Sequence, residues 1–126
     1  MKSYNGQLEL LDLRNHLTVM RSIKQAPEIQ AMQQAIDITT ATLKAVTKKG
    51  FNEFNWEYEV EAAITAGFRK RVAGHGYRPI VAGGHNACTL HYVQNNDELR
   101  KGDLILLDVG AEVENYSADL TRTYVY

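Results

Sequence analysis

The sequence predicts an α+β domain in which two helices pack on one face of an antiparallel sheet. Two segments with apolar residues at helical spacing come first in the chain, and short β-prone segments interrupted by glycine follow after Gly76. Proteins that place helices before strands in this way commonly keep the helices on one side of the sheet. The length of 126 residues suits one such domain with a modest core.

The first predicted helix begins near Pro27, because proline in the first turn of a helix loses no hydrogen bond. Ala26, just before it, is a poor capping residue. A Lys-Lys-Gly sequence at 48–50 predicts the end of the helix, since cations suit its negative pole and glycine suits the position after it. Upstream, residues 8–14 fit either a short strand or a helical turn. One face of the helix is expected to face the core and carries Ile29, Met32, Ile36, Leu43 and Val46.

The second predicted helix begins after Asn55, a good capping residue, with Glu57 in its first turn to complement the helix dipole. It ends in the cation- and glycine-rich sequence FRKRVAGHG. Its apolar residues recur every four positions and are expected to fill the core: Trp56, Val60, Ile64 and Phe68. The apolar stripes of both helices are interpreted as core-packing surfaces and not as membrane or partner contacts.

The second half of the chain ends in a predicted β-hairpin. A turn at residues 101–103 precedes the nearly continuous apolar strand Leu104–Leu107, and ENYSADLTRTYVY supplies the return strand, with the loop around residues 113–115. Asp108 and Asp119 lie within this hairpin. Their presence needs an explanation, because strands tend to exclude aspartate and an unpaired buried carboxylate is costly.

The spacing of Asp108 and Asp119 predicts that both carboxylates lie on one face of the hairpin. They are 119 − 108 = 11 positions apart, and a hairpin loop of two or four residues pairs positions that differ by an odd number. Two adjacent negative charges in a dry site require a protonated carboxylate or a cation between them, and hard divalent ions prefer such oxygen ligands. A structural role is the alternative, with Asp108 accepting hydrogen bonds near a bulge and Asp119 paired with Arg122.

Three stretches of sequence carry a family resemblance. They are GGHNACTLHY, NNDELRKGDLILLDVGAEVENYSADLTRTY and, upstream, MRSIKQAPEIQAMQQAIDITTATLKAV. The most specific positions are His91-Tyr92, Gly102-Asp103, Asp108-x-Gly110 and Ala118-Asp119-x-Thr121-Arg122-Thr123. Together they closely resemble the catalytic domain of the Xaa-Pro aminopeptidases and prolidases, the pita-bread metallopeptidases. The resemblance implies that residues 21–126 are the first half of a pita-bread domain and that residues 1–20 are a linker or a remnant preceding it.

The resemblance also implies roles for single residues. Asp108 matches a ligand to one ion of a two-metal centre, Asp119 matches the ligand that bridges both ions, and His91 matches a catalytic histidine that contacts substrate and assists proton transfer. The implied reaction is metal-assisted hydrolysis of the bond between an N-terminal residue and proline, so the implied partner is a peptide with proline at its second position. Mn(II) is the expected ion, with Co(II) or Zn(II) as alternatives. His85, in a Gly- and Asn-containing loop, is a candidate to line the substrate site, and a surface position fits it equally well.

The other candidate side chains are given structural roles. His16 and His75 are expected to be surface or hydrogen-bonding residues. Cys88 is expected to be a small buried hydrophobic residue and not a nucleophile, because no base is naturally paired with it. Arg122 is expected to orient an aspartate or the hairpin and not to touch substrate.

The implied metal centre is incomplete in this sequence. The resemblance places a further histidine and two glutamates in a second half of the domain, which would follow Tyr126. We therefore expect a partial domain that binds its missing half, binds the two ions poorly or not at all by itself, and is inactive alone. An exposed apolar sheet face and an open edge invite pairing, so we also expect a homodimer through residues around Leu104–Leu107 and Tyr124–Tyr126.

Two other functions stay open. A methionine aminopeptidase relative shares the fold and the aspartate pair, although the ADLTRT segment argues against it. A non-catalytic pita-bread module that binds proteins or peptides is the second, although such relatives commonly lose the metal carboxylates. The net charge of −1, with both signs interleaved, predicts no nucleic-acid partner. No apolar run resembles a signal peptide or a membrane span, and the lone Cys88 fits a cytoplasmic location.

Overall fold

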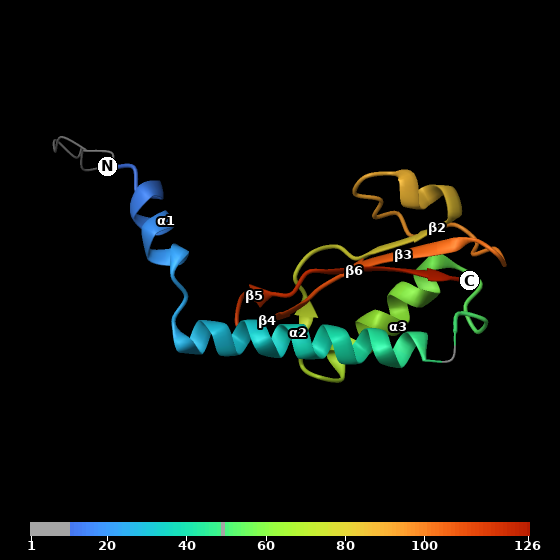
Figure 1. Cartoon of the computed structure of the whole chain (residues 1–126), viewed down its shortest axis with the longest axis horizontal. Helices are drawn as coiled ribbons and strands as arrows, with labels where there is room; N and C mark the ends of the chain where they lie inside the picture. Colours follow the sequence, from blue (N-terminus) through green and yellow to red (C-terminus); the bar gives the residue numbers. More distant parts are fainter. Residues whose placement is uncertain (1–10, 49) are drawn as a thin grey trace, which may run out of the picture.

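Two helices lie across one face of a small antiparallel sheet, as the sequence predicts (Figure 1). The structure is a computed structural model that describes residues 11–48 and 50–126. The elements in chain order are α1 (Arg14–Ser22), α2 (Ala26–Thr47), α3 (Glu57–Arg69), β1 (Gly74–His75), β2 (Ile80–Gly83), the 3-10 helix η1 (Gly84–Cys88), β3 (Leu104–Val109), β4 (Ala111–Val113), β5 (Tyr116–Ser117) and β6 (Leu120–Val125).

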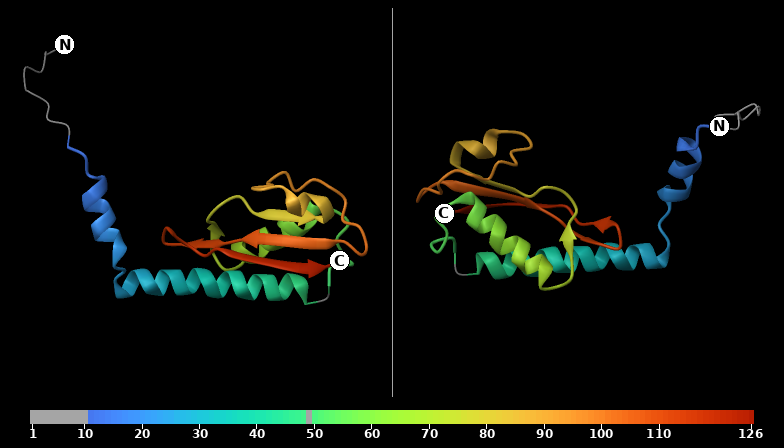
Figure 2. Two further views of the ribbon diagram at one scale, coloured as in Figure 1. Left: turned by 45° about the horizontal axis from the view of Figure 1, so that its top comes forward. Right: turned by 180° about the vertical axis from the view of Figure 1, so that it is seen from behind.

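The strands form two antiparallel sheets of three strands each, in the orders β2-β3-β6 and β1-β4-β5. The segments β3–β4 and β5–β6 are the two arms of one long hairpin. They keep a single register, from Val109 opposite Leu120 to Val113 opposite Tyr116. Helices α2 and α3 cover one face of the β2-β3-β6 sheet, while η1 and the loop after it lie over the other face, called the open face below (Figures 1 and 2).

Helix α1 accounts for only the last of residues 8–14, because residues 11–13 have no regular structure. Residues 8–10 lie outside the described part of the chain, and a helix begins at Arg14. This helix contributes no buried residue and points away from the sheet and the other helices (Figure 2). It also runs across the boundary expected between residues 20 and 21. Within the described residues, no helix is long and apolar enough to span a bilayer.

The start of α2 differs by one residue from the prediction. Gln25, and not Ala26, occupies the capping position, and its backbone N–H donates to the Glu28 carboxylate at 2.6 Å. That bond satisfies a free N–H group at the start of the helix without a Ser or Asp cap. The helix ends at Thr47, and Gly50 adopts a left-handed conformation with φ of 75°. Lys49 of the predicted helix end lies outside the described residues.

The predicted core face of α2 is partly wrong. Leu43 is buried, but Ile29 and Ile36 are 56% and 45% exposed. The buried residues of the helix are instead Ala31, Ala35, Thr39, Thr42 and Leu43. Small side chains are needed here because the neighbouring elements come very close: a methyl group added at Gly67 of α3 would lie 2.4 Å from the Thr42 methyl carbon.

Helix α3 follows its predicted face more closely. Val60, Ile64 and Phe68 are fully buried, as predicted, whereas Trp56 is 38% exposed. Trp56 occupies the capping position predicted for Asn55, and its backbone N–H donates to the Glu59 carboxylate at 3.1 Å. Glu57, the residue after Trp56, is fully buried instead.

The central strand β3 separates the core from the open face of the sheet. Ile105, Leu107 and Val109 alternate toward the helices and are fully buried, while Leu104 on the opposite face is 54% exposed. Within Leu104–Leu107, around which we expected a dimer interface, Ile105 and Leu107 are thus buried in the core. Tyr124 and Tyr126 of the same expected surface also pack partly against the core.

Candidate functional site

The carboxylates of Asp108 and Asp119 converge on the hydroxyl group of Tyr77. The Tyr77 oxygen lies 2.6 Å from Asp108 Oδ1 and 3.1 Å from Asp119 Oδ1, and it donates to them. The prediction that both carboxylates share one face of the hairpin is confirmed. A hydroxyl group has a single proton, so at any moment only one of the two carboxylates accepts it.

The hairpin register explains this convergence. Asp108 lies opposite Thr121, and the same register places Asp119 opposite Gly110, two positions further along the same arm of the hairpin. The carboxylates are thus diagonal neighbours. The register depends on a two-residue turn at residues 114–115, where both residues have positive φ angles of 49° and 64°. Such a turn matches the twist of antiparallel strands.

Gly110 allows the two arms and Tyr77 to meet at this point. A Cβ atom added at Gly110 would lie 1.8 Å from the Ala118 carbonyl oxygen and 2.9 Å from Tyr77 Cε1. The Gly110 carbonyl oxygen also accepts a hydrogen bond from the Gly76 N–H at 2.9 Å, which holds the chain next to Tyr77. Glycine at 110 is therefore a packing requirement of the site.

The environment of Tyr77 keeps its hydroxyl group protonated. Burial raises the pKa of Tyr77 strongly, and the hydrogen bond and negative charge of Asp108 and the charge of Asp119 raise it further. The phenol is thus a permanent donor between two carboxylates. The structural alternative for Asp119 is not realised, because Arg122 donates to the Thr121 carbonyl oxygen at 2.7 Å and makes no ion pair with Asp119.

His91 lies near this pair, in the loop that covers the open face of the sheet. Two cavities of about 310 and 360 Å³ border the site, and both are lined by His91 and Asp108. Tyr77 and Asp119 line the second. His91 is exposed and has a left-handed backbone with φ of 54°, which is unusual for a residue other than glycine. The structure therefore brings His91 and the aspartates to the same part of the surface.

The other candidate residues lie elsewhere or differ from expectation. His85 is exposed, borders neither of these two cavities and lies 4.0 Å from the Asp97 carboxylate, so its substrate-lining role stays a prediction. Cys88 is exposed and borders the first cavity, and the prediction of a buried residue is wrong because η1 lies above the sheet and outside the core. His16 is exposed, as expected, and His75 hydrogen-bonds Thr65 at 2.9 Å.

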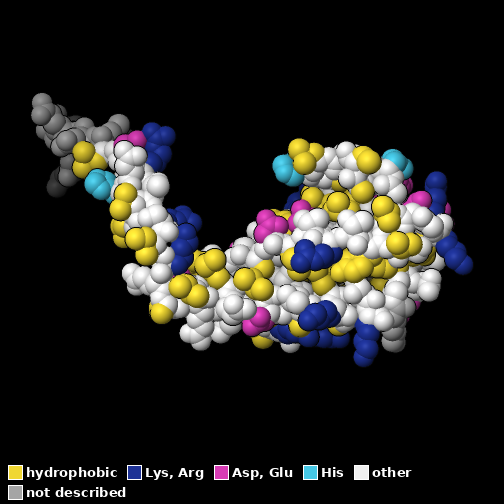
Figure 3. Space-filling model, in the orientation of Figure 1, with side chains coloured by type: hydrophobic (Ala, Val, Ile, Leu, Met, Phe, Trp, Pro, Cys, Tyr) yellow, Lys and Arg dark blue, Asp and Glu magenta, His cyan; other side chains and the backbone are white. Residues whose placement is uncertain are grey.

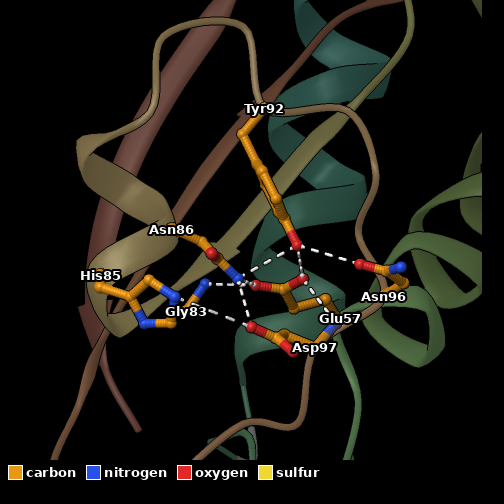
Figure 4. A network of polar contacts seen from close by, with 7 residues as sticks. All are labelled: Glu57, Gly83, His85, Asn86, Tyr92, Asn96 and Asp97. Carbon is orange, nitrogen blue, oxygen red and sulfur yellow. Dashed lines mark hydrogen bonds and ion pairs between the residues drawn. The ribbon is translucent and has the colours of Figure 1, made fainter.

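A buried polar network around Glu57 was missed by the sequence analysis (Figure 4). Glu57 Oε1 accepts hydrogen bonds from the Gly83 N–H at 2.8 Å and from Asn86 Nδ2 at 3.0 Å. Its Oε2 accepts from the Tyr92 hydroxyl at 2.7 Å and from the Asp97 N–H at 3.0 Å. Burial and then the bond to Glu57 raise the pKa of Tyr92 to about 12, so this hydroxyl also stays protonated.

One signal in the sequence points to the burial of Glu57. It precedes Val60 by three residues and Ile64 by seven, which is the spacing of one helical face. Trp56 lies one position off that face. The expected role of Glu57, as a partner of the helix dipole, therefore misses its burial.

One pair of side chains among the described residues has the chemistry of metal ligands. Asp108 and Asp119 offer adjacent carboxylate oxygens, which are ligands that hard divalent ions prefer. Across residues 11–48 and 50–126, no group of three or more His, Cys, Asp or Glu side chains is arranged to hold a metal ion. The pair therefore fits two of the ligands of a larger ligand set.

Comparisons with known proteins agree on one family. The sequence profile of metallopeptidase family M24 matches residues 30–126. An Xaa-Pro aminopeptidase of Haemophilus influenzae is 46% identical over 118 residues, which cover 92% of this chain and 27% of that protein. This chain thus spans about a quarter of the length of that relative.

Solved structures show the same fold. Proline aminopeptidase P II from Yersinia pestis superimposes with a TM-score of 0.82 and 37% identity, over 90% of this chain and 26% of that one. Aminopeptidase P from Escherichia coli with the inhibitor Pro-Leu superimposes with a TM-score of 0.83 and 34% identity, over 91% and 26% of the two chains.

Proposed function

Because this chain belongs to metallopeptidase family M24, we propose that Asp108 and Asp119 are ligands of a divalent-metal centre and that His91 is a catalytic residue beside it. The convergence of both carboxylates on the Tyr77 hydroxyl is the observation that carries this proposal. It brings two oxygen ligands to one point from strands that approach closely at Gly110. Mn(II) is the ion we propose, with Co(II) or Zn(II) as alternatives, because hard or borderline ions accept carboxylate ligands.

The proposed reaction is hydrolysis of the bond between an N-terminal residue and proline. The divalent ions would supply an activated water and polarise the peptide carbonyl group. Tyr77 would hold the two carboxylates together and keep a proton between them. His91, on the wall of both cavities, would contact the peptide and transfer a proton to or from it. The similarity to an Xaa-Pro aminopeptidase and a proline aminopeptidase supports a peptide with proline at the second position as the substrate.

The two alternative functions are less well supported. The similar proteins described above are named as Xaa-Pro or proline aminopeptidases, which disfavours a methionine aminopeptidase. A module that only binds proteins needs no convergent carboxylates, yet Asp108 and Asp119 meet here at the cost of placing two like charges together. The cytoplasmic location stays a prediction.

We further propose that the part of the open face that η1 and the following loop leave exposed, together with the edge strand β6, is covered by a second copy of this chain or, in a longer protein, by the second half of the domain. Leu104 and Val125 on this face are 54% and 71% exposed, and Leu90 above it is 85% exposed. Within the described residues, β6 is an edge strand. Figure 3 shows hydrophobic side chains gathered along the strands. Sedimentation at micromolar concentration should show a dimer, and a stable monomer would contradict this proposal.

A chimaera tests the proposed activity. This chain replaces the matching 118-residue segment of the Haemophilus influenzae Xaa-Pro aminopeptidase. The chimaera should hydrolyse Xaa-Pro peptides when Mn(II) is added, and Asp119→Asn should lower kcat/KM by at least about a hundredfold. Glu98→Gln is the matched control, because Glu98 is exposed and its side chain has no hydrogen bond in the described structure. A folded chimaera that hydrolyses no Xaa-Pro peptide, or that keeps its activity with Asn at position 119, would contradict the proposal.

A further inference from the structure

The loop that carries His91 has little apolar surface to hold it in place. It runs from the end of η1 to residue 98 and covers the open face of the sheet (Figure 2). Leu90 is 85% exposed, and Cys88 and His91 are exposed as well. Among the apolar residues of the loop, Tyr92 is the one that is buried, so polar contacts must supply much of what holds the loop in one conformation.

Glu57 and the buried Asn95 are polar anchors of this loop, and Glu57 is the one that bonds Tyr92, next to His91. Its four donors come from three places: Gly83 at the end of β2, Asn86 in η1, and Tyr92 and Asp97 in the loop (Figure 4). Glu57 is fully buried at the start of α3, a helix whose apolar face is fixed in the core. A rigid helix therefore presents one carboxylate to η1, which precedes the loop, and to Tyr92 and Asp97 within the loop.

The chemistry of the anchor requires a carboxylate. Each oxygen of Glu57 accepts two hydrogen bonds, and both oxygens are used. A glutamine would place an NH₂ group against two of the four donors, and these bonds would be lost. A buried donor left without an acceptor is costly, so the loop should move away from α3 in such a variant.

We propose that Glu57 is a positioning residue that holds His91 over Asp108 through Tyr92. Tyr92 follows His91 directly in the chain, and its hydroxyl donates to Glu57 at 2.7 Å. His91 has a φ of 54°, a conformation that its surroundings must impose. The fixed Tyr92 side chain and this backbone together set the direction of the imidazole. The functional meaning of His91 rests on the proposed function, whereas its placement by Glu57 does not.

The test follows the imidazole by NMR in the full chain. His91 and Ile80 line the same two cavities, so the readout is the nuclear Overhauser effect (NOE) between the His91 ring and the Ile80 methyl groups, and its absence in the wild type would also overturn the proposal. In Glu57→Gln this NOE should disappear, and the amides of Gly83 and Asp97 should exchange with solvent about tenfold faster, because they lose a charged acceptor. Glu98→Gln removes a charge from the same loop and should change neither readout.

Tyr92→Phe distinguishes a specific effect on the position of His91 from a general loosening of the loop. It removes a single hydroxyl group, so the Gly83 amide should stay protected while the His91–Ile80 NOE weakens at least about threefold. Tyr58→Phe, on the exposed side of α3, is the matched control. An unchanged NOE in both Glu57→Gln and Tyr92→Phe would overturn the proposal, and if Glu57→Gln does not fold, Tyr92→Phe decides alone. Mn(II) binding by the wild-type chain is measured separately, and its absence would contradict the proposed function without affecting the NOE.

Discussion

Substituting Gly110 with alanine should damage the site more than any other single methyl group added to the hairpin. The added Cβ would lie 1.8 Å from the Ala118 carbonyl oxygen, whereas a carbon and a carbonyl oxygen in contact need about 3.3 Å. The two arms of the hairpin must therefore separate by about 1.5 Å at this point. Tyr77 Cε1, at 2.9 Å, blocks movement in its own direction.

The expected cost follows from the kind of atoms that collide. A backbone oxygen within a paired hairpin cannot rotate away, so the destabilisation should reach the upper end of the range for overpacking, about 3 kcal/mol. With a urea m-value of about 1.5 kcal/mol/M, the unfolding midpoint should fall by about 2 M. Circular dichroism across a urea titration measures this midpoint directly.

Gly74→Ala is the matched control for this measurement. Gly74 lies in β1 of the neighbouring sheet, and a Cβ added there would meet no atom within 4 Å. Its φ is not positive, so alanine should be neutral or stabilise the protein by up to about 1 kcal/mol. Equal midpoints for Gly110→Ala and Gly74→Ala would refute the conclusion that Gly110 is required for the close approach of the two arms.

Three further predictions concern the metal, the activity and pH. Isothermal titration should detect weak Mn(II) binding by the chain, with a Kd of about 1 mM, and equal binding by Asp119→Asn would refute the ligand assignment. The isolated chain should not hydrolyse Xaa-Pro peptides with added Mn(II), because two carboxylates leave most coordination positions to water; turnover that disappears in Asp119→Asn would contradict this. Burial lowers the pKa of His75 below 6.5, so the neutral form is favoured in the folded protein. Its stabilising contribution should be complete above this value and decrease as the pH falls through it, and the urea midpoint of His75→Gln should change less between about pH 7.5 and about pH 5 than that of the wild type.

Local rules in the sequence were enough for helices α2 and α3, for the C-terminal hairpin and for the aspartate pair. The alternation of side chains along a strand, combined with a short loop of even length, depends only on neighbouring residues. It placed Asp108 and Asp119 on one face, where the structure finds them. The apolar face of α3 followed from helical spacing for the same reason, since Val60, Ile64 and Phe68 are close in the chain.

The partners of these residues were decided by the tertiary structure. Tyr77 reaches Asp108 and Asp119 across 31 and 42 positions, and Glu57 collects donors that lie 26 to 40 positions away. The spacing of apolar residues along the sequence does not predict contacts between residues so far apart in the chain, because each contact depends on how whole helices and strands pack together. The buried face of α2 is decided in the same way: Ile29 and Ile36 fit the helical pattern, but only small residues such as Ala35 fit where another element approaches closely. Sequence spacing fixes which side chains share a face, whereas the packing distance between elements decides which face is buried and which polar groups meet there.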